Sequence, residues 1–90
     1  IRSERAAVFE QLNNLDGITA YPSAANFILF RTPENRASSI FDSLKEQGIL
    51  IKNLAPQGGL LCDCLRVTIG TPEENKAFLK ALRKSLGSLS

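Results

Sequence analysis

The sequence LRVTIGTPEEN, residues 65–75, joins a strand pattern directly to a helix start. Its first half alternates apolar and polar residues, which predicts an extended segment with one buried face and with Arg66 on the opposite face. Gly70 interrupts the strand, Thr71 precedes a proline at the first helical position, and Glu74 completes a capping box. The stretch therefore predicts a rigid strand-to-helix corner with an outward guanidinium, a geometry that suits an anion-binding site.

The size and composition of the chain predict one globular domain, residues 1–90. Hydrophobic residues make up 43% of the 90 positions and charged residues 22%, with no low-complexity tract. The net charge of +2 is small and its Lys and Arg residues are scattered, which argues against nucleic-acid binding. No apolar run approaches the roughly 20 residues that span a bilayer, so we expect no membrane partner and a cytoplasmic location. Because the chain does not begin with Met, we expect it to be a piece or a processed product of a longer protein.

The chain contains no histidine. This removes the commonest general base and every nucleophile that depends on a histidine. Cys62 and Cys64 are separated by one residue, a spacing that strains an intrachain bridge and supplies only half of a zinc shell. We expect reduced thiols and no metal site.

The hydrophobic pattern predicts the order helix, strand, strand, helix, strand, strand, helix. The expected helices are residues 3–15, a segment from Thr32-Pro33-Glu34 to Gly48, and a segment that begins at Pro72. The expected strands are residues 18–21, 26–31, 49–52 and 65–69, with residues 60–64 as an extension of the last one and residues 53–59 as a loop.

This order predicts a two-layer α+β sandwich, in which helices cover one face of a largely antiparallel sheet. The strand at 26–31 is apolar on both faces, so we expect it to be central and to form a hairpin with 18–21. Two helical stripes should face the sheet: Ala37, Ile40, Phe41 and Leu44 in the second helix, and Ala77, Phe78, Ala81 and Leu82 in the third. The opposite sheet face carries Arg66 and is expected to dock against another domain, so the isolated chain should self-associate.

Three segments, residues 23–30 (SAANFILF), 48–52 (GILIK) and 65–75, together resemble the C-terminal small domain of histidinol-phosphate aminotransferase. This family belongs to the pyridoxal-phosphate aminotransferases of the aspartate aminotransferase fold type. The resemblance implies transfer of an amino group between L-histidinol phosphate and 2-oxoglutarate, in histidine biosynthesis.

The resemblance also implies roles for particular residues. Arg66 stands where the family places the arginine that grips the substrate's anionic group, and a guanidinium on a strand suits that role because it presents a rigid fork of donors. Lys52 stands where the family usually has a second arginine for the substrate phosphate, a departure that loses bidentate geometry. Asn26 matches the family's Asn-Phe pair and is expected to support the site without doing chemistry.

Each of these residues also has a plainer interpretation. Arg66 alone would be a solvated strand residue, Lys52 an edge-strand charge that discourages strand pairing, and Asn26 a structural residue.

The family's large domain holds the lysine that binds pyridoxal phosphate covalently and the other residues around that cofactor. No counterpart is visible in this sequence, so the resemblance implies no catalytic or cofactor-binding residue here and an inactive isolated chain. The implied partners are the large domain of the same chain, the two substrates and, in the parent, a second subunit.

Two other interpretations remain open. One is a relative with the same fold, such as a threonine-phosphate decarboxylase or an aromatic aminotransferase. The other is a free-standing ferredoxin-like regulatory or binding module, although such modules usually open with a strand rather than with the helix expected at residues 3–15.

Overall fold

The structure is a computed structural model that describes residues 3–87. Its elements follow the predicted order, with two short 3-10 helices added between the last two strands. They are α1 (Glu4–Asn13), β1 (Thr19–Ala20), β2 (Phe27–Arg31), α2 (Ala37–Glu46), β3 (Lys52–Asn53), η1 (Ala55–Gln57), η2 (Gly59–Leu61), β4 (Cys64–Thr68) and α3 (Pro72–Gly87).

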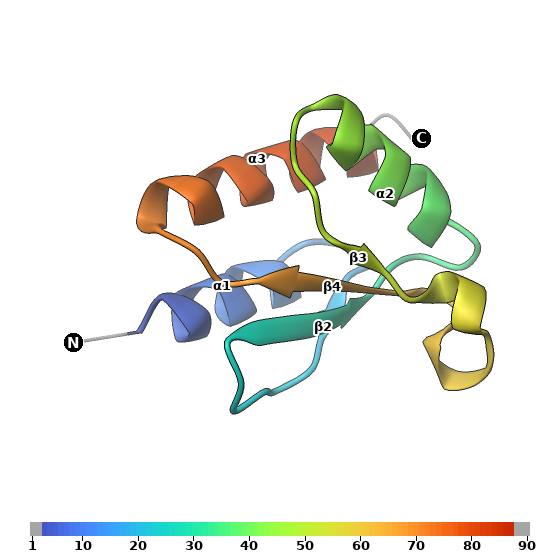
Figure 1. Cartoon of the computed structure of the whole chain (residues 1–90), viewed down its shortest axis with the longest axis horizontal. Helices are drawn as coiled ribbons and strands as arrows, with labels where there is room; N and C mark the ends of the chain where they lie inside the picture. The colour runs from blue at the N-terminus through green and yellow to red at the C-terminus, as the bar shows by residue number, and fades with distance from the viewer. Residues whose placement is uncertain (1–2, 88–90) are drawn as a thin grey trace.

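The four strands form one antiparallel sheet in the order β1-β2-β4-β3. The predicted hairpin of the first two strands and the central place of β2 are confirmed. Figure 1 shows the helices gathered behind and above the strands, which leaves the other side of the sheet without a helix. The predicted two-layer α+β architecture is therefore confirmed.

The core lies between the sheet and the helices. Ile28 and Phe30 of β2 are fully buried, as is Leu65 of β4. The Phe30 ring meets the Phe78 ring of α3 edge-on, with centroids 5.9 Å apart. Alternation along β2 and β4 therefore sends one set of side chains into the core and the other set to the helix-free side.

The predicted capping box at the start of α3 is confirmed. The amide of Thr71 donates to Glu74 Oε1 at 2.8 Å, and the amide of Glu74 donates to Thr71 Oγ1 at 3.2 Å. The buried Asn75 continues this corner, since its Oδ1 accepts from the Gly70 amide at 2.9 Å and its Nδ2 donates to Glu4 Oε1 at 3.0 Å. These bonds fix the end of β4 against α1 and α3.

The similar signal at Thr32-Pro33-Glu34 was wrong as a helix start. Thr32 is buried, and both its amide and its hydroxyl donate to the Asp63 carbonyl, at 2.8 and 3.1 Å. The chain then makes a turn in which Asn35 has a φ of 62°, and α2 begins only at Ala37. The Thr32 hydroxyl that would cap a helix here is instead used in a tertiary contact with Asp63.

The strand expected at 49–52 is also wrong for most of its length. The Ile49 amide donates to the Leu44 carbonyl at 2.9 Å and so still belongs to the end of α2, and pairing with β4 begins only at Lys52. The extension expected at 60–64 fails because Gly58 and Gly59 adopt φ values of 69° and 58° and turn the chain into η2. Only Cys64 of that extension is in β4.

Smaller differences concern the ends and faces of helices. α1 ends at Asn13, two residues before the predicted boundary, although Val8 and Leu12 are buried as expected. In α3, Phe78, Ala81 and Leu82 are buried as predicted, but Ala77 is exposed. Its place in the core is taken by Asn75 and Leu79, because the buried stripe begins at the Asn75 corner and Ala77 lies off that stripe.

Candidate functional site

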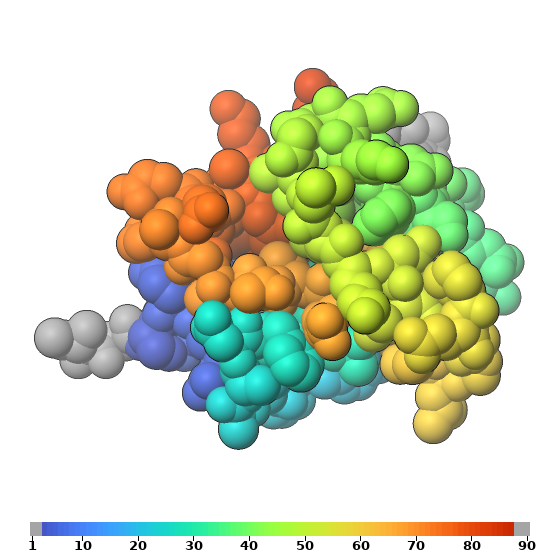
Figure 2. Space-filling model, in the orientation of Figure 1, coloured from blue at the N-terminus to red at the C-terminus, as the bar shows by residue number. Residues whose placement is uncertain are grey.

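The side of the sheet that no α-helix covers carries most of the candidate site, and only its Arg31–Cys64 end is covered, by Leu60 of η2. We call it the open face and define it by Phe27, Leu29, Arg31, Lys52, Cys64, Arg66 and Thr68. In Figure 2, atoms of β4 (orange) are visible at the surface between the teal segment that includes the start of β2 and the yellow-green segment that leads into β3. The open face therefore combines apolar side chains with three cations and has no acidic member.

Arg66 lies on this face, as the alternation of β4 predicts. Its neighbours Leu65 and Val67 are buried, whereas Arg66 is half-buried. The guanidinium Cζ lies 4.8 Å from the centroid of the Phe27 ring. Among residues 3–87 it has no hydrogen bond and no ion pair, so its donors are free to bind an external anion.

Lys52 is directly opposite Arg66 in the β3–β4 register and is exposed. Directly opposite residues of an antiparallel pair have Cβ atoms about 5 Å apart on the same face. Phe27, however, belongs to β2 on the other side of β4, so the guanidinium leans away from the lysine. Two of the predicted binding residues are thus cross-strand neighbours, and the guanidinium of Arg66 lies toward β2, on the side of β4 away from Lys52.

Asn26 joins the start of β2 to the end of β4. Its Nδ2 donates to the Ile69 carbonyl at 3.3 Å, and its own carbonyl accepts from the Ile69 amide at 3.0 Å. Asn26 is exposed and immediately precedes Phe27. Its position suits support of the site through the backbone, and its predicted supporting role remains a prediction.

A second arginine on the open face was not singled out from the sequence. Arg31 Nε donates to Tyr21 Oη at 2.9 Å, and its Nη2 donates to the Leu60 carbonyl at 2.7 Å. The hydrogen bond to Tyr21 is the main cause that raises the pKa of Arg31. Arg31 therefore holds the loop between β3 and β4 in place, and its guanidinium is less available than that of Arg66.

Cys64 lies at the Arg31 end of the open face. It is fully buried, whereas Cys62 is exposed, and both are free thiols, as expected. Burial raises the pKa of Cys64 and the nearby Arg31 opposes that effect. The two cysteines therefore differ in chemical access although they are close in sequence.

Phe27 was also missed. The strand pattern places it on the same face as Arg66 only once the register of β2 and β4 is known, and that register pairs Phe27 with Thr68. The periodicity of each strand indicates which residues share a face, but it does not determine which of them are opposite one another.

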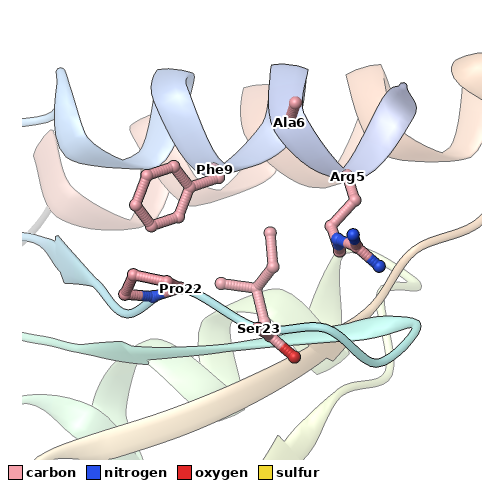
Figure 3. Close-up of a pocket in the computed structure, with 6 residues that line it drawn as sticks. Arg5, Ala6, Phe9, Pro22 and Ser23 are labelled. Carbon is pink, nitrogen blue, oxygen red and sulfur yellow. The ribbon is translucent and has the colours of Figure 1, made fainter. Parts of the chain in front are cut away.

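The pockets of the structure do not bring the predicted residues together. Figure 3 shows one of about 170 Å3 between α1 and the segment before β2, where the Phe9 and Pro22 side chains face each other. Arg5 borders it, but its guanidinium donates to the carbonyls of Ala24 and Ala25 at 3.1 and 3.2 Å. The pocket is mostly apolar and lies apart from Arg66 and Lys52.

The residues present do not fit pyridoxal phosphate. Every lysine of the chain is exposed, and four of them lie on outward helix faces.

Residues 3–87 contain no group of three or more metal-ligating side chains, and no helix there is long and apolar enough to span a bilayer. What this chain can supply is a fixed cationic contact for an anion.

Comparison with protein families gives a match over residues 1–82 to the model described as aminotransferase class I and II. The curated histidinol-phosphate aminotransferase 2 of Nitrosococcus oceani is 63% identical over 79 residues, which is 88% of this chain and 22% of that protein. This chain thus spans less than a quarter of the length of that relative.

Two solved structures have the same fold. Histidinol-phosphate aminotransferase from Sinorhizobium meliloti, in complex with pyridoxal-5'-phosphate, gives a TM-score of 0.84 at 26% identity, over 97% of this chain and 24% of that one. L-threonine-O-3-phosphate decarboxylase from Porphyromonas gingivalis gives a TM-score of 0.80 at 32% identity, over 90% of this chain and 25% of that one. The predicted resemblance is confirmed.

Proposed function

Because the chain belongs to the aminotransferase class I and II family, we propose that it is the C-terminal small domain of a larger enzyme that transaminates L-histidinol phosphate with 2-oxoglutarate. The domain corresponds to residues 1–90, and the enzyme would act in histidine biosynthesis. The match covers only 22% of the Nitrosococcus oceani relative, which supports the interpretation of this chain as one domain of a larger enzyme, with about three quarters of that enzyme outside it.

The observation that carries the proposal is that the guanidinium of Arg66 is held in place but has no polar partner in the part of the chain that the structure describes. Its guanidinium lies on the open face, over an aromatic ring, with no acidic or hydrogen-bonding partner in residues 3–87. A strand fixes its direction, and its donors match a carboxylate or a phosphate. In the proposed enzyme, Arg66 binds the anionic group of the substrate and so orients the reacting end, which is how a remote contact accelerates a reaction.

Lys52 has a secondary role in the proposal. As an exposed point charge opposite Arg66, it adds positive potential without fixing the geometry of the anion. Asn26 supports Arg66 indirectly, because it ties the residue before Phe27 to the end of β4.

Pyridoxal phosphate belongs to the part of the proposed enzyme outside this chain, where it would supply the electron sink for amino-group transfer. The open face is the surface that would meet that part, and substrate would bind between the two. The parent would be a cytoplasmic homodimer. The free thiols Cys62 and Cys64 agree with a reducing compartment.

A second candidate is decarboxylation of an O-phosphorylated amino acid. The likeness to the Porphyromonas gingivalis decarboxylase supports it, since that structure has a higher identity to this chain than the aminotransferase from Sinorhizobium meliloti. Arg66 would bind the substrate phosphate in either reaction, and Lys52 would add positive potential beside it.

The test uses the full-length parent, purified with pyridoxal phosphate. Transamination is measured as 2-oxoglutarate-dependent consumption of L-histidinol phosphate, and decarboxylation as CO2 released from L-threonine phosphate. Turnover of the first substrate alone supports the proposal. Turnover of the second alone assigns the chain to the decarboxylase instead, and activity with neither overturns both.

A further inference from the structure

Arg66 and Phe27 are in contact although they are not directly opposite each other in the β2–β4 pair. Register pairs Phe27 with Thr68 and Leu29 with Arg66, so Phe27 is a diagonal neighbour of the arginine. The guanidinium Cζ nevertheless lies 4.8 Å from the ring centroid, so the two side chains meet diagonally across the β2–β4 pair. Diagonal neighbours of this kind are within reach of long and aromatic side chains.

The direction of the Arg66 side chain determines where on the open face an anion can bind. The ring is on the β2 side of Arg66, whereas Lys52 is on the β3 side, so the guanidinium is held away from the other cation. It lies toward the end of β4, where Asn26 binds both polar groups of the Ile69 backbone. The backbone of Phe27 is therefore fixed to the end of β4 by the Asn26–Ile69 bonds and by the β2–β4 ladder that continues from them.

We propose that Phe27 is the positioning residue of Arg66, an inference that rests on the proposed anion-binding role of that arginine. The guanidinium lies over the ring, and its N–H groups have no acceptor among residues 3–87, so they stay available to an anion on the open face. A planar carboxylate or a phosphate monoester then binds edge-on, through two parallel hydrogen bonds. Without the ring, the same arginine would sample several rotamers and would meet the anion in fewer of its conformations.

A purely structural role for Phe27 makes a different prediction. Phe27 is half-buried and would then contribute mainly apolar area, which a leucine supplies nearly as well as a tyrosine. If Phe27 positions Arg66 through the π face of its ring, Phe27→Tyr and Phe27→Leu should differ, because tyrosine keeps an aromatic ring under the guanidinium and leucine does not. The matched control is Leu29→Val, which shortens an apolar side chain on the same strand and face and leaves the ring intact.

The first measurement does not depend on substrate. In the full-length parent, the ε-NH proton of Arg66, assigned by the loss of its signal in Arg66→Lys, should be shifted to high field by the ring current of Phe27. We expect the shift in the wild type, in Phe27→Tyr and in Leu29→Val, and its loss in Phe27→Leu. An unshifted proton in the wild type overturns the contact itself.

The second measurement is steady-state kinetics with the substrate that the wild-type parent turns over, so a failure of the proposed function is seen in the wild type before any variant is compared. Phe27→Leu should raise KM about threefold to tenfold with a smaller change in kcat, and Phe27→Tyr should restore it. In an Arg66→Lys background the effect of Phe27→Leu should largely disappear. Equal KM values for Phe27→Leu and wild type, or the same increase in the Arg66→Lys background, would refute the positioning role.

Discussion

Lys52 lies directly opposite Arg66 across the β3–β4 pair, and residues 3–87 supply no carboxylate to either side chain. Like charges at directly opposite positions destabilise a sheet. An anion bound on the open face, as proposed, would reduce this repulsion and would accept charge-assisted hydrogen bonds from Arg66. The arrangement is therefore suited to a ligand rather than to the stability of the sheet.

Substitution of Lys52 should show how much the second cation contributes. In the full-length parent, Lys52→Ala should raise KM for the phosphorylated substrate about threefold to tenfold, because an exposed charge contributes roughly 1 kcal/mol. The effect should shrink as salt increases, since Lys52 is solvent-exposed. Lys45→Ala, on an exposed position of α2, is the control and should leave KM unchanged. A salt-independent loss would contradict this assignment.

Arg66→Lys removes the fork of donors and keeps the charge. We expect kcat/KM of the parent to fall by an amount equivalent to about 1.5 to 3 kcal/mol, the value of a hydrogen bond to a charged group. The unfolding midpoint should change little, because the guanidinium makes no hydrogen bond in residues 3–87. Arg36→Lys, on an exposed residue before α2, is the matched control. Kinetics equal to wild type for Arg66→Lys would exclude the anion-binding role.

The two Thr-Pro-Glu segments show how far local sequence determines this fold. At Thr71 every partner of the cap is within a few residues, and the capping box forms as predicted. At Thr32 the competing partner is the carbonyl of Asp63, 31 residues away, and the helix starts later. No local pattern could reveal that competitor.

The candidate site divides in the same way. The face on which Arg66 lies follows from alternation within one strand. That Lys52 is opposite it depends on the β3–β4 register, and that Phe27 lies under its guanidinium depends on the β2–β4 register, whose partners are about 40 residues apart in sequence. Arg66, Lys52 and Asn26 could be singled out from the sequence, whereas Phe27 and the mutual geometry of these residues could not.

The capping box makes a stability prediction with an internal control. Thr71→Ala should lower the free energy of unfolding by about 0.5 to 2 kcal/mol, since the Glu74 amide loses its acceptor. Gly70→Ala should also destabilise, because the added Cβ would lie 2.5 Å from Glu74 Oε1 and displace the other half of the box. Glu73→Gln, in the same helical turn, should have a small effect. Urea denaturation of the three variants tests the ranking, and equal values would contradict it.

Ser85 is the centre of a polar contact between α2 and α3. Its hydroxyl donates to the Ala81 carbonyl at 2.9 Å and accepts from Gln47 Nε2 at 3.2 Å, and its Oγ shares a hydroxyl–hydroxyl hydrogen bond with Ser43 Oγ at 2.8 Å. Ser85→Ala should reduce the free energy of unfolding by about 1 to 2 kcal/mol, because it leaves buried polar partners with fewer bonds. Ser39→Ala, exposed on α2, should change it by less than about 0.5 kcal/mol. Chemical denaturation that gave the two variants equal stability would show that the network contributes nothing.

The two thiols should differ in reactivity and in their effect on stability. Cys62 is exposed and should react with Ellman's reagent in the native protein, whereas Cys64 is fully buried and should react only after unfolding. Cys62→Ser should therefore abolish the native reaction, and Cys64→Ala should leave it intact. Reaction of the native Cys62→Ser variant would show that β4 is more open than its burial indicates.

Burial raises the pKa of Cys64, so the folded state retains the thiol proton at a pH where the unfolded state has lost it. The stabilising contribution of this thiol is complete below its ordinary pKa of about 8.5 and is lost as pH rises from there through the raised folded pKa. Between about pH 8 and 10, wild-type unfolding free energy should fall more steeply with pH than that of Cys64→Ala, by up to about 1.4 kcal/mol per pH unit. Parallel curves for wild type and Cys64→Ala, measured by urea denaturation, would mean that the Cys64 thiol titrates alike in both states, and the buried environment of β4 at Arg31 would then need revision.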